Sequence, residues 1–298
     1  MEIQTYLNER RLVVEEALRR YTLAAEGPFA HHIEAMRYSL FVGGKRVRPI
    51  LCLAAGAAID DSSATVANLL PVACALECIH TYSLIHDDLP AMDDDDLRRG
   101  KPTNHVVYGE AAAILAGDGL LTWAFDLLTD PAGSAIPAQR RLAIAHRIAR
   151  AAGPLGMVGG QSLDIASENS DISFASLQTI HSSKTGALIT CAVETGAIGA
   201  GADDGQIAAL VRFGNQIGLA FQIVDDLLNV TATTDQLGKA AGSDAAHGKA
   251  TYPAYFGVDG TRTRAAAAVE AAKDALAGFN AKAEPLRALA DYIYSRTS

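Results

Sequence analysis

The sequence predicts an all-α fold from three observations. Apolar residues recur at helical spacing through most of the 298 residues, and the alternation of β-branched residues that marks strands is scarce. Short breaks rich in Gly, Pro, Ser or Asp separate segments of about 12 to 25 residues, a length typical of helices. No linker is long enough to divide domains. We therefore expect a single domain over residues 1–298, with long central helices around one cavity.

The breaks set the order of the helices. The first helix is amphipathic and charged, whereas the fourth is apolar enough to lie in a protein core. Breaks at 60–63, 131–133, 153–154, 167–173 and 199–204 carry residues that end helices or form turns. Helices are predicted over residues 3–24, 29–42, 47–59, 64–88, 107–129, 137–152, 155–167, 174–200, 204–230, 262–278 and 284–295.

Charge and composition exclude two classes of protein. The chain carries 25 Lys and Arg against 34 Asp and Glu, a net charge of −9, which argues against a nucleic-acid-binding surface. Hydrophobic residues make up 49% of the chain, too many for a disordered protein. Acidic clusters that hold a substrate through metal ions would contribute to this negative charge, so the balance does not exclude an anionic substrate.

The cysteines and the N-terminus favour a cytoplasmic protein without stable membrane insertion. Cys74 and Cys78 share a helical face, but no second pair or His partner completes a zinc site. All four cysteines lie in apolar surroundings, so we expect buried free thiols in a reducing compartment. The N-terminal helix lacks the apolar core of a signal peptide, and no run of about 18 uncharged apolar residues predicts a membrane span.

Residues 84–103 hold the densest group of charged side chains. Six aspartates fall between Asp87 and Asp96, directly after an apolar segment, and Arg98 and Arg99 follow. Mg²⁺ takes a few carboxylates and completes its shell with phosphate oxygens, and arginine matches phosphate bidentately. The stretch therefore predicts divalent cations that bind a polyanion. A solvated acidic turn is the alternative.

A second aspartate pair, Asp225 and Asp226, also follows an apolar run. Residues three and four apart share a helix face, so Gln222, Asp225 and Asn229 form one stripe. Because each pair ends an apolar helical segment, we expect the two pairs to face one another across the cavity.

The first aspartate pair needs a distortion to complete its site. Asp93 lies six residues after Asp87, so an ideal helix would turn it away. Pro90 removes a backbone donor and clashes with the preceding turn, so we expect a kink or bulge there that returns Asp93 toward Asp87.

A basic segment at residues 41–49 predicts an anion site. Its glycines free the backbone to approach an anion, and the positive end of the helix that begins near Pro49 points the same way. An ordinary basic turn is the alternative. His80 lies two helical turns before Asp87 and either donates to an anion near the metal site or is a satisfied core histidine. The segment holds Gly43, Gly44, Lys45, Arg46 and Arg48.

Three later motifs complete the candidate site. Gln161 and Asp164 share a face after a glycine pair, which is otherwise explained by close helix packing. Lys184 lies with Thr185 in an apolar helix, where a lone cation is costly without an anionic partner. A segment rich in small residues, 231–251, is interpreted as a loop that closes over a bound anion or as a plain surface loop; it contains Lys239 and Lys249.

With these motifs in this order, the chain resembles the short-chain trans-prenyltransferases of the polyprenyl synthetase family, and among them the bacterial farnesyl diphosphate synthases most. The resemblance covers about residues 41–253. It is carried by DDLPAMDDDDLRRGKPT, DDLLN, GGKRVRP, GGQSLD, KTGAL and GKAAGSDAAHGKATYP. It implies an isoprenoid-synthase helical bundle, a homodimer, and an enzyme that joins isopentenyl diphosphate to an allylic diphosphate such as dimethylallyl or geranyl diphosphate.

The resemblance also implies a role for each motif residue. The residues that would hold Mg²⁺, three ions per site, are Asp87, Asp93 and Asp225, supported by Asp88 and Asp226. Those that would bind the allylic substrate are Arg98, Lys184, Thr185, Gln222 and Lys239. Those that would bind isopentenyl diphosphate are Lys45, Arg48, His80 and Arg99, and Gly44 and Lys249 are further substrate-binding residues. The family's second motif usually ends in Asp, and here that position is Asn229.

The most detailed expectation concerns the chain length of the product. Ser83 lies one helical turn below Asp87 and is too small to block a tunnel for the growing chain, so its neighbour Tyr82 is expected to form the floor and limit the product to farnesyl diphosphate. Geranylgeranyl or geranyl diphosphate is the alternative product. More remote alternatives are a terpene cyclase, an HD-type phosphohydrolase that uses His86 with Asp87, and a non-catalytic partner subunit.

Overall fold

The protein is described by a computed structural model that covers residues 2–168, 170–231 and 250–296. Helices form nearly all of its regular structure, so the all-α prediction is confirmed. The elements are α1 (Ile3–Tyr21), the 3₁₀ helix η1 (Gly27–Phe29), α2 (Ala30–Phe41), α3 (Val47–Ile59), α4 (Ser63–Asp87), β1 (Leu97–Arg98), β2 (Lys101–Pro102), α5 (Asn104–Tyr108), α6 (Glu110–Thr129), α7 (Ala138–Ala152), α8 (Met157–Ala166), α9 (Phe174–His181), the π-helix η2 (Ser182–Gly186), α10 (Ala187–Ala200), α11 (Asp204–Thr231), α14 (Tyr252–Ala275), the 3₁₀ helix η3 (Ala281–Ala283) and α15 (Glu284–Ser295).

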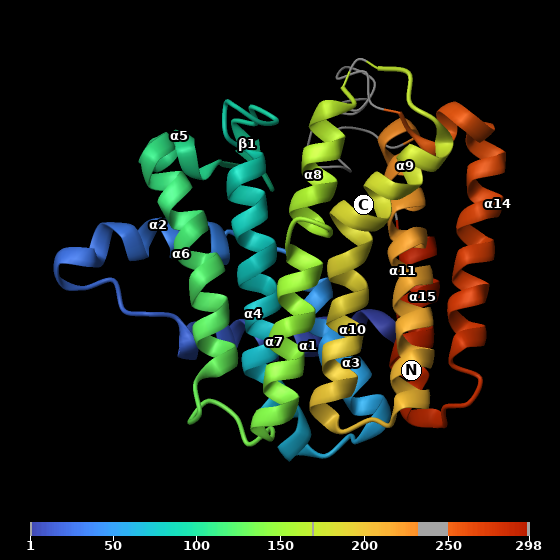
Figure 1. Cartoon of the computed structure of the whole chain (residues 1–298), viewed down its shortest axis with the longest axis horizontal. Helices are drawn as coiled ribbons and strands as arrows, with labels where there is room; N and C mark the ends of the chain where they lie inside the picture. Colours follow the sequence, from blue (N-terminus) through green and yellow to red (C-terminus); the bar gives the residue numbers. More distant parts are fainter. Residues whose placement is uncertain (1, 169, 232–249, 297–298) are drawn as a thin grey trace.

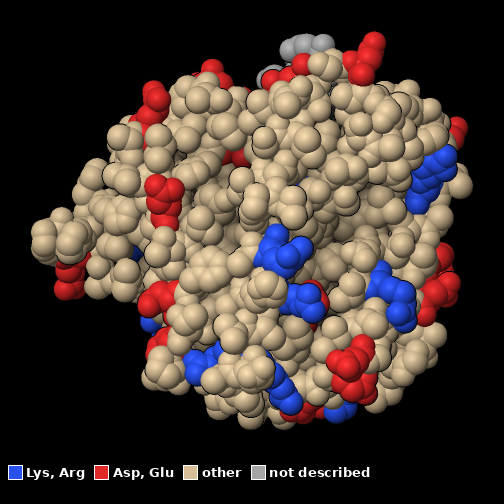
Figure 2. All heavy atoms as spheres, viewed as in Figure 1, with Lys and Arg blue, Asp and Glu red and all other residues tan. Residues whose placement is uncertain are grey.

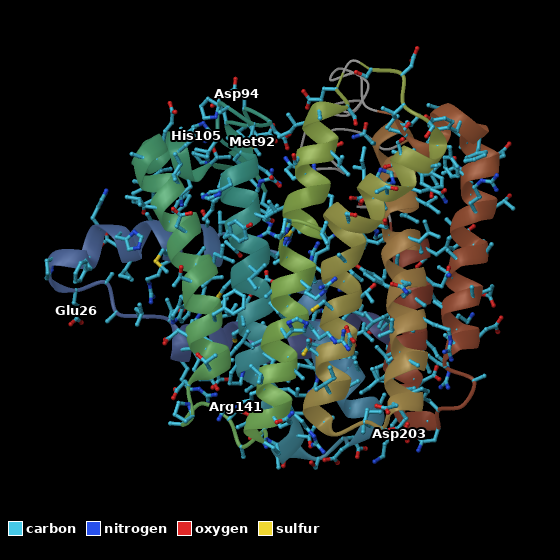
Figure 3. All side chains as sticks on the ribbon, viewed as in Figure 1. Glu26, Met92, Asp94, His105, Arg141 and Asp203 are labelled. Atoms are coloured by element: carbon cyan, nitrogen blue, oxygen red, sulfur yellow. The ribbon has the colours of Figure 1, made fainter. Side chains whose placement is uncertain are left out.

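The long helices stand side by side and place both aspartate motifs at one end. In Figure 1, α4, α6, α10, α11 and α14 run roughly parallel, and the carboxyl ends of α4 and α11 both lie at the top of the view. Helix α4 packs against α3 and α6, α10 packs against α3 and α11, and α11 packs against α14. In Figure 3, Met92 and Asp94 lie at this upper end, whereas Arg141 and Asp203 lie at the opposite end.

The core follows from the composition of the helices. Helix α4 is buried on almost every side, with Leu69, Leu76 and Ile79 fully enclosed, as expected of a helix with no polar stripe. Helices near the surface, such as α15, bury a single apolar face. All four cysteines are buried and free, as predicted.

Three helix boundaries differ from the predictions. The segment predicted over 107–129 is two helices, because Gly109 at φ 86° separates α5 from α6. The segment predicted over 174–200 is interrupted by η2. The helix predicted to begin at residue 262 begins at Tyr252 and crosses a non-helical residue, Gly257 (φ 66°, ψ 174°). Glycine permits these positive φ angles, and spacing alone does not reveal them.

The chain after Asp87 departs from the predicted kink. Helix α4 ends at Asp87, and a turn through Pro90 follows, in which the amide of Asp93 donates to the carbonyl of Asp87 at 2.9 Å. A two-stranded antiparallel hairpin, β1–β2, then carries Arg98 and Arg99. The return of Asp93 toward Asp87 is therefore achieved by ending the helix rather than bending it.

Three helices, α4, α6 and α11, are long and apolar enough to cross a membrane by length and composition. In α4, 67% of the most apolar 18-residue window is buried inside the bundle, and in α11 the buried share of that window is 50%. The corresponding share in α6 is 39%. A larger share of the apolar window is therefore left uncovered in α6 than in α4 or α11.

Candidate active site

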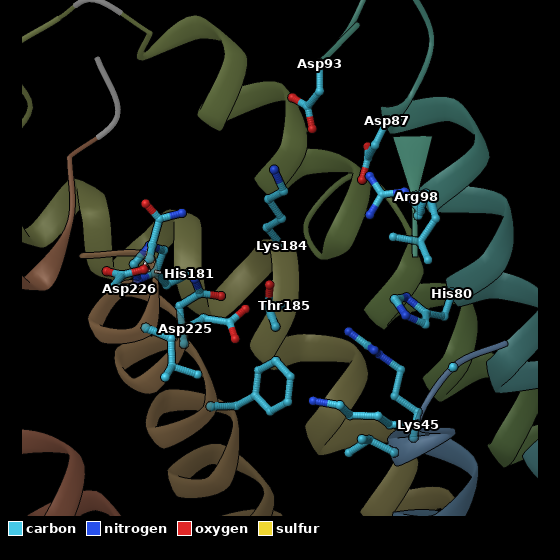
Figure 4. Close-up of a pocket in the computed structure, with 18 of the residues that line it drawn as sticks. Lys45, His80, Asp87, Asp93, Arg98, His181, Lys184, Thr185, Asp225 and Asp226 are labelled. Atoms are coloured by element: carbon cyan, nitrogen blue, oxygen red, sulfur yellow. Dashed lines mark hydrogen bonds and ion pairs between the residues drawn. The ribbon is translucent and has the colours of Figure 1, made fainter. Parts of the chain in front are cut away.

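A cavity of about 700 Å³ opens at the end of the bundle where the aspartate motifs lie. Its walls come from the start of α3, the carboxyl end of α4, the β1–β2 hairpin, η2 and α11. Figure 4 shows Asp87 and Asp93 on one side, Asp225 and Asp226 on the other, and Lys184 reaching up between them. The expected opposition of the two pairs across one cavity is present in the structure.

Asp87 lies at the last position of α4, where the helix meets the cavity. Burial raises the pKa of this carboxyl group to about 6, and the negative charges of Asp93 and Asp88 act in the same direction against Lys184 and Arg98. A carboxylate that is costly to ionise in the protein alone is stabilised when a cation binds it. This position therefore suits a metal ligand.

Asp88 is engaged by the hairpin. Its two carboxylate oxygens accept hydrogen bonds from Arg98 Nε at 2.7 and 2.9 Å, and Arg98 Nη2 lies 2.5 Å from Oδ1. Asp88 is 3% exposed, and Asp95 lies 3.6 Å from the same guanidinium group. Asp88 therefore fixes Arg98, which lines the cavity, and supports the site rather than facing it.

In the second pair, too, one aspartate is buried and supports the structure while the other faces the cavity. Asp226 is buried and accepts from the amide of Tyr252 at 2.8 Å and from Gln222 Nε2 at 3.3 Å, so it joins α11 to the start of α14. Asp225 is half exposed and lies 2.5 Å from Arg296 Nη2. Asn229, on the next turn of the same stripe, is 5% exposed and lines the cavity.

Lys184 and Thr185 come from η2, where the wider π turn interrupts the helical run between α9 and α10. Lys184 Nζ donates to Asp164 Oδ2 at 2.6 Å, which gives this half-buried cation the anionic partner that the sequence required. Nearby, Gln161 is 8% exposed, and neither atom of its amide has a hydrogen-bond partner among the described residues.

The opposite wall is basic. Arg48 is 9% exposed, its Nε has no hydrogen-bond partner in the described chain, and burial lowers its pKa to about 10. Burial, reinforced by the positive charges of Arg48 and Arg99, holds the pKa of His80 well below its usual value. His80 is therefore a neutral imidazole that can donate one hydrogen bond. Arg99 donates to the carbonyl of Gly43.

This donor set fits a hard divalent cation together with a polyanion. No three His, Cys, Asp or Glu side chains within residues 2–168, 170–231 and 250–296 already form a metal cage. Carboxylate oxygens instead face one another across the cavity, with lysine and arginine beside them. Mg²⁺ is commonly held in this way, by one or two carboxylates plus substrate phosphate oxygens. The ligand that bridges the walls would complete the shell.

The sequence matches the family described as Polyprenyl synthetase over residues 30–284. The chain belongs to this family. It is 47% identical to a farnesyl diphosphate synthase of Geobacillus stearothermophilus, over 99% of this chain and 98% of that one. It is 46% identical to a geranylgeranyl diphosphate synthase of Cyanophora paradoxa, over 99% and 96%.

Solved structures of family members have the same fold. A crystal structure described as an FPP/GFPP synthase from Zymomonas mobilis superposes with a TM-score of 0.87 at 37% identity, covering 98% of this chain and 99% of that one. A geranyltransferase from Legionella pneumophila gives a TM-score of 0.86 at 34% identity, covering 100% and 99%. The predicted isoprenoid-synthase bundle is thereby confirmed.

Two sets of predicted residues do not line the cavity as described. Tyr82 is 7% exposed and packs edge-on against the ring of His86 at 5.4 Å, and Ser83 Oγ donates to the carbonyl of His80 at 2.9 Å. Neither lines the cavity, although α4 residues on both sides of them in the sequence, His80 and Leu84, do. Lys239 and Lys249 lie outside the described residues.

Among the cavity residues that sequence reasoning missed are Arg296, His181 and Glu77. Arg296 lies beside Asp225, far away in the sequence, and no motif indicates it. His181 is 4.0 Å from Asp226 Oδ1 and stacks on Tyr252, and burial lowers its pKa to about 4. Its position three residues before Lys184, on the same helical face, was a usable signal.

Proposed function

We propose that this enzyme condenses isopentenyl diphosphate head-to-tail with dimethylallyl or geranyl diphosphate, with three Mg²⁺ ions per site, and releases farnesyl diphosphate. The observation that carries the proposal is that one cavity has two separate cationic walls. One lies with the aspartate pairs and Lys184, and the other is formed by the start of α3 with His80. A substrate with a single diphosphate would need only one of them.

The metal-facing wall is assigned to the allylic substrate. Asp87, Asp93 and Asp225 would hold Mg²⁺, which when bound neutralises the charge of the allylic diphosphate and makes it a better leaving group. Asp88 and Asp226 would act as supports, consistent with their hydrogen bonds to Arg98 and to the amide of Tyr252. The remaining allylic ligands are proposed to be Arg98, Lys184, Thr185, Gln222, Lys239 and Lys249.

The basic wall is assigned to isopentenyl diphosphate. Arg48 has an unpartnered Nε in a buried setting, and His80 is a neutral donor beside it. Lys45 lies at the same end of the cavity in Figure 4. Arg99 and the backbone at Gly44 complete the wall, because the Arg99 guanidinium group packs directly against Gly44. These groups would position the second substrate without supplying a nucleophile.

The reaction itself needs no nucleophile from the protein. The allylic C–O bond breaks, and its electron pair leaves with the diphosphate, whose charge is stabilised by the lysine and arginine side chains. The double bond of isopentenyl diphosphate then forms a C–C bond to the allylic carbocation. A proton is finally lost from the adjacent carbon to the departing diphosphate. Apolar wall residues such as Leu84 and Phe221 exclude water, which would quench the cation.

Product analysis tests the proposal. The purified enzyme is mixed with Mg²⁺, isopentenyl diphosphate and a labelled allylic diphosphate, and the products are chromatographed. A labelled fifteen-carbon diphosphate supports the proposal, whereas a cyclised hydrocarbon formed from the allylic substrate alone supports a terpene cyclase. The HD-type alternative is disfavoured, because His86 Nε2 lies 3.0 Å from the carbonyl of Ile114 and turns toward α6 rather than into the cavity with Asp87.

Asn229→Asp should change turnover by less than about tenfold, which is roughly 1.4 kcal/mol of barrier. The amide of Asn229, one turn beyond Asp225, can orient a metal-bound water without adding charge. Steady-state kinetics at several Mg²⁺ concentrations checks this. A severe loss would show that the amide has a specific role, and a large gain would show that the natural site lacks a charge that the metal needs.

Tyr82→Ala should lengthen the product, with twenty-carbon diphosphate joining or replacing farnesyl diphosphate. A growing chain that extends from the cavity between α4 and α6 would meet the Tyr82 ring, which packs edge-on against His86. Removal of the ring would open space below Ser83. Chromatography of wild-type and variant products decides the matter. Phe125→Ala, on α6, is the matched variant, since a shift there and not at Tyr82 would place the floor on α6.

We further propose a cytoplasmic homodimer in which residues 1–298 form one catalytic domain. Figure 2 shows few charged side chains over α8 and between α4 and α6. Apolar side chains of α5 and α6 stay exposed, among them Val106 (49%), Val107 (46%), Ile114 (43%) and Leu115 (57%). A second copy that covers this surface would account for them. Light scattering on the purified protein tests the assembly.

A further inference from the structure

Arg46, in the middle of the basic segment, is not positioned as a substrate ligand. Its side chain is 1% exposed, its Nη1 lies 2.7 Å from Glu77 Oε1, and its Nη2 donates to the carbonyl of Leu40 at 2.8 Å. Glu15, on α1, lies further away, at 3.9 Å from its Nε. Two of its three nitrogens are thus committed to the protein, although it lies between two residues assigned to the substrate.

The backbone at Arg46 is in an uncommon conformation. Arg46 has φ 53° and ψ 37°, the left-handed region, and precedes the first residue of α3. Such a conformation is strained for a residue other than glycine, so it needs support from the surrounding structure. The ion pair with Glu77 and the bond to Leu40 supply that support. They set the direction in which the chain leaves the loop and begins α3.

Glu77 lies on the helix that carries the opposite part of the same wall. It is 2% exposed, lies on α4 one turn before His80, and borders the cavity. Its negative charge also acts on Arg48 and Arg99, where it raises the pKa of each against the effect of burial. One carboxylate therefore joins the loop before α3 to the turn of α4 that presents His80.

We propose that Glu77 is a positioning residue for the second diphosphate site. Through Arg46 it fixes the start of α3 relative to α4, so that Lys45 and Arg48 converge with His80 on one phosphate group. The identity of that ligand as isopentenyl diphosphate rests on the proposed function. We call the Glu77–Arg46 ion pair the strut. Its presence does not depend on the proposed function, because it follows from the distances and burial described above.

A purely stabilising pair would behave differently. Breaking a buried ion pair from one side leaves an unpaired buried charge and is strongly destabilising, whereas replacing both partners by apolar residues is often neutral. A role in stability alone therefore predicts normal kinetics in any variant that folds. A positioning role predicts weaker binding of one substrate even when stability is restored.

The test measures KM for each substrate separately in Glu77→Gln. We expect KM for isopentenyl diphosphate to rise by about tenfold or more with kcat within about threefold, because uniform binding is lost while the reacting atoms are untouched. KM for geranyl diphosphate should stay within about twofold. Glu194→Gln is the matched control, since Glu194 pairs with Arg147 at 3.1 Å away from the cavity and should leave both KM values unchanged.

The double variant Arg46→Met with Glu77→Met separates positioning from stability. It should unfold at a temperature close to that of the wild type and still show the raised KM for isopentenyl diphosphate. A folded double variant with both KM values normal would overturn the inference, as would an equal rise in both. Failure of the double variant to fold would also overturn it, because the pair would then be a folding determinant. A wild-type protein without prenyl transfer would instead contradict the proposed function.

Discussion

Asp87→Ala is expected to lower turnover by at least about 10³-fold while the far-ultraviolet circular dichroism spectrum remains that of the wild type. The carboxyl group lies where α4 opens into the cavity, and burial raises its pKa to about 6. A cation is needed there to stabilise the ionised form, and the variant removes the group that would bind it. Because the burial of this charge costs free energy in the protein alone, its removal should not destabilise the bundle.

The same loss is expected from Asp225→Ala, which also releases Arg296 from its 2.5 Å contact. Asp259→Ala is the control for removing an aspartate, since Asp259 is 99% exposed in its side chain and lies on α14. Turnover is measured with saturating substrates over a range of Mg²⁺ concentrations. Turnover near that of the wild type in both cavity variants would refute the assignment of these carboxylates to the metal.

The aspartate motifs could be predicted because their information is local. Each pair follows an apolar run, so the end of a buried helix and the acidic residues are read from one stretch of sequence. Charge supplies the remaining constraint, since two such pairs in one domain are costly to bury without cations between them. The same reasoning placed Lys184 in the site, and the structure gives it Asp164 as a partner at 2.6 Å.

The rest of the site depends on contacts between distant segments. Arg296 meets Asp225 across 71 positions of the chain, and the Arg46–Glu77 pair spans 31. Nothing in the local pattern distinguishes Arg46, which is a strut, from Arg48, which faces the cavity. The η2 turn was equally hidden, because the residues around it read as one continuous helix and the wider turn is a product of packing.

Gly160 is the packing contact that holds η2 in place, and Gly160→Ala is expected to lower kcat by about 10²-fold, since a displacement of about 1 Å at a catalytic group can have that effect. A Cβ at Gly160 would lie 2.2 Å from the backbone nitrogen of Lys184 and 2.6 Å from its Cα. Neither atom can move without shifting the π turn. Lys184 and Thr185 would then leave their positions at the cavity wall.

The matched control is Gly196→Ala, which should lower the melting temperature without lowering kcat of the folded protein. Its Cβ would lie 2.1 Å from the carbonyl oxygen of Cys52, so it forces α10 away from α3 with similar strain but far from the cavity. Overpacking of this kind costs about 1–3 kcal/mol. Both variants are assayed below their melting temperatures, with kcat and unfolding followed on the same preparations. If kcat falls equally in the two variants, the effect of Gly160 is one of stability, and η2 does not depend on it for the placement of Lys184.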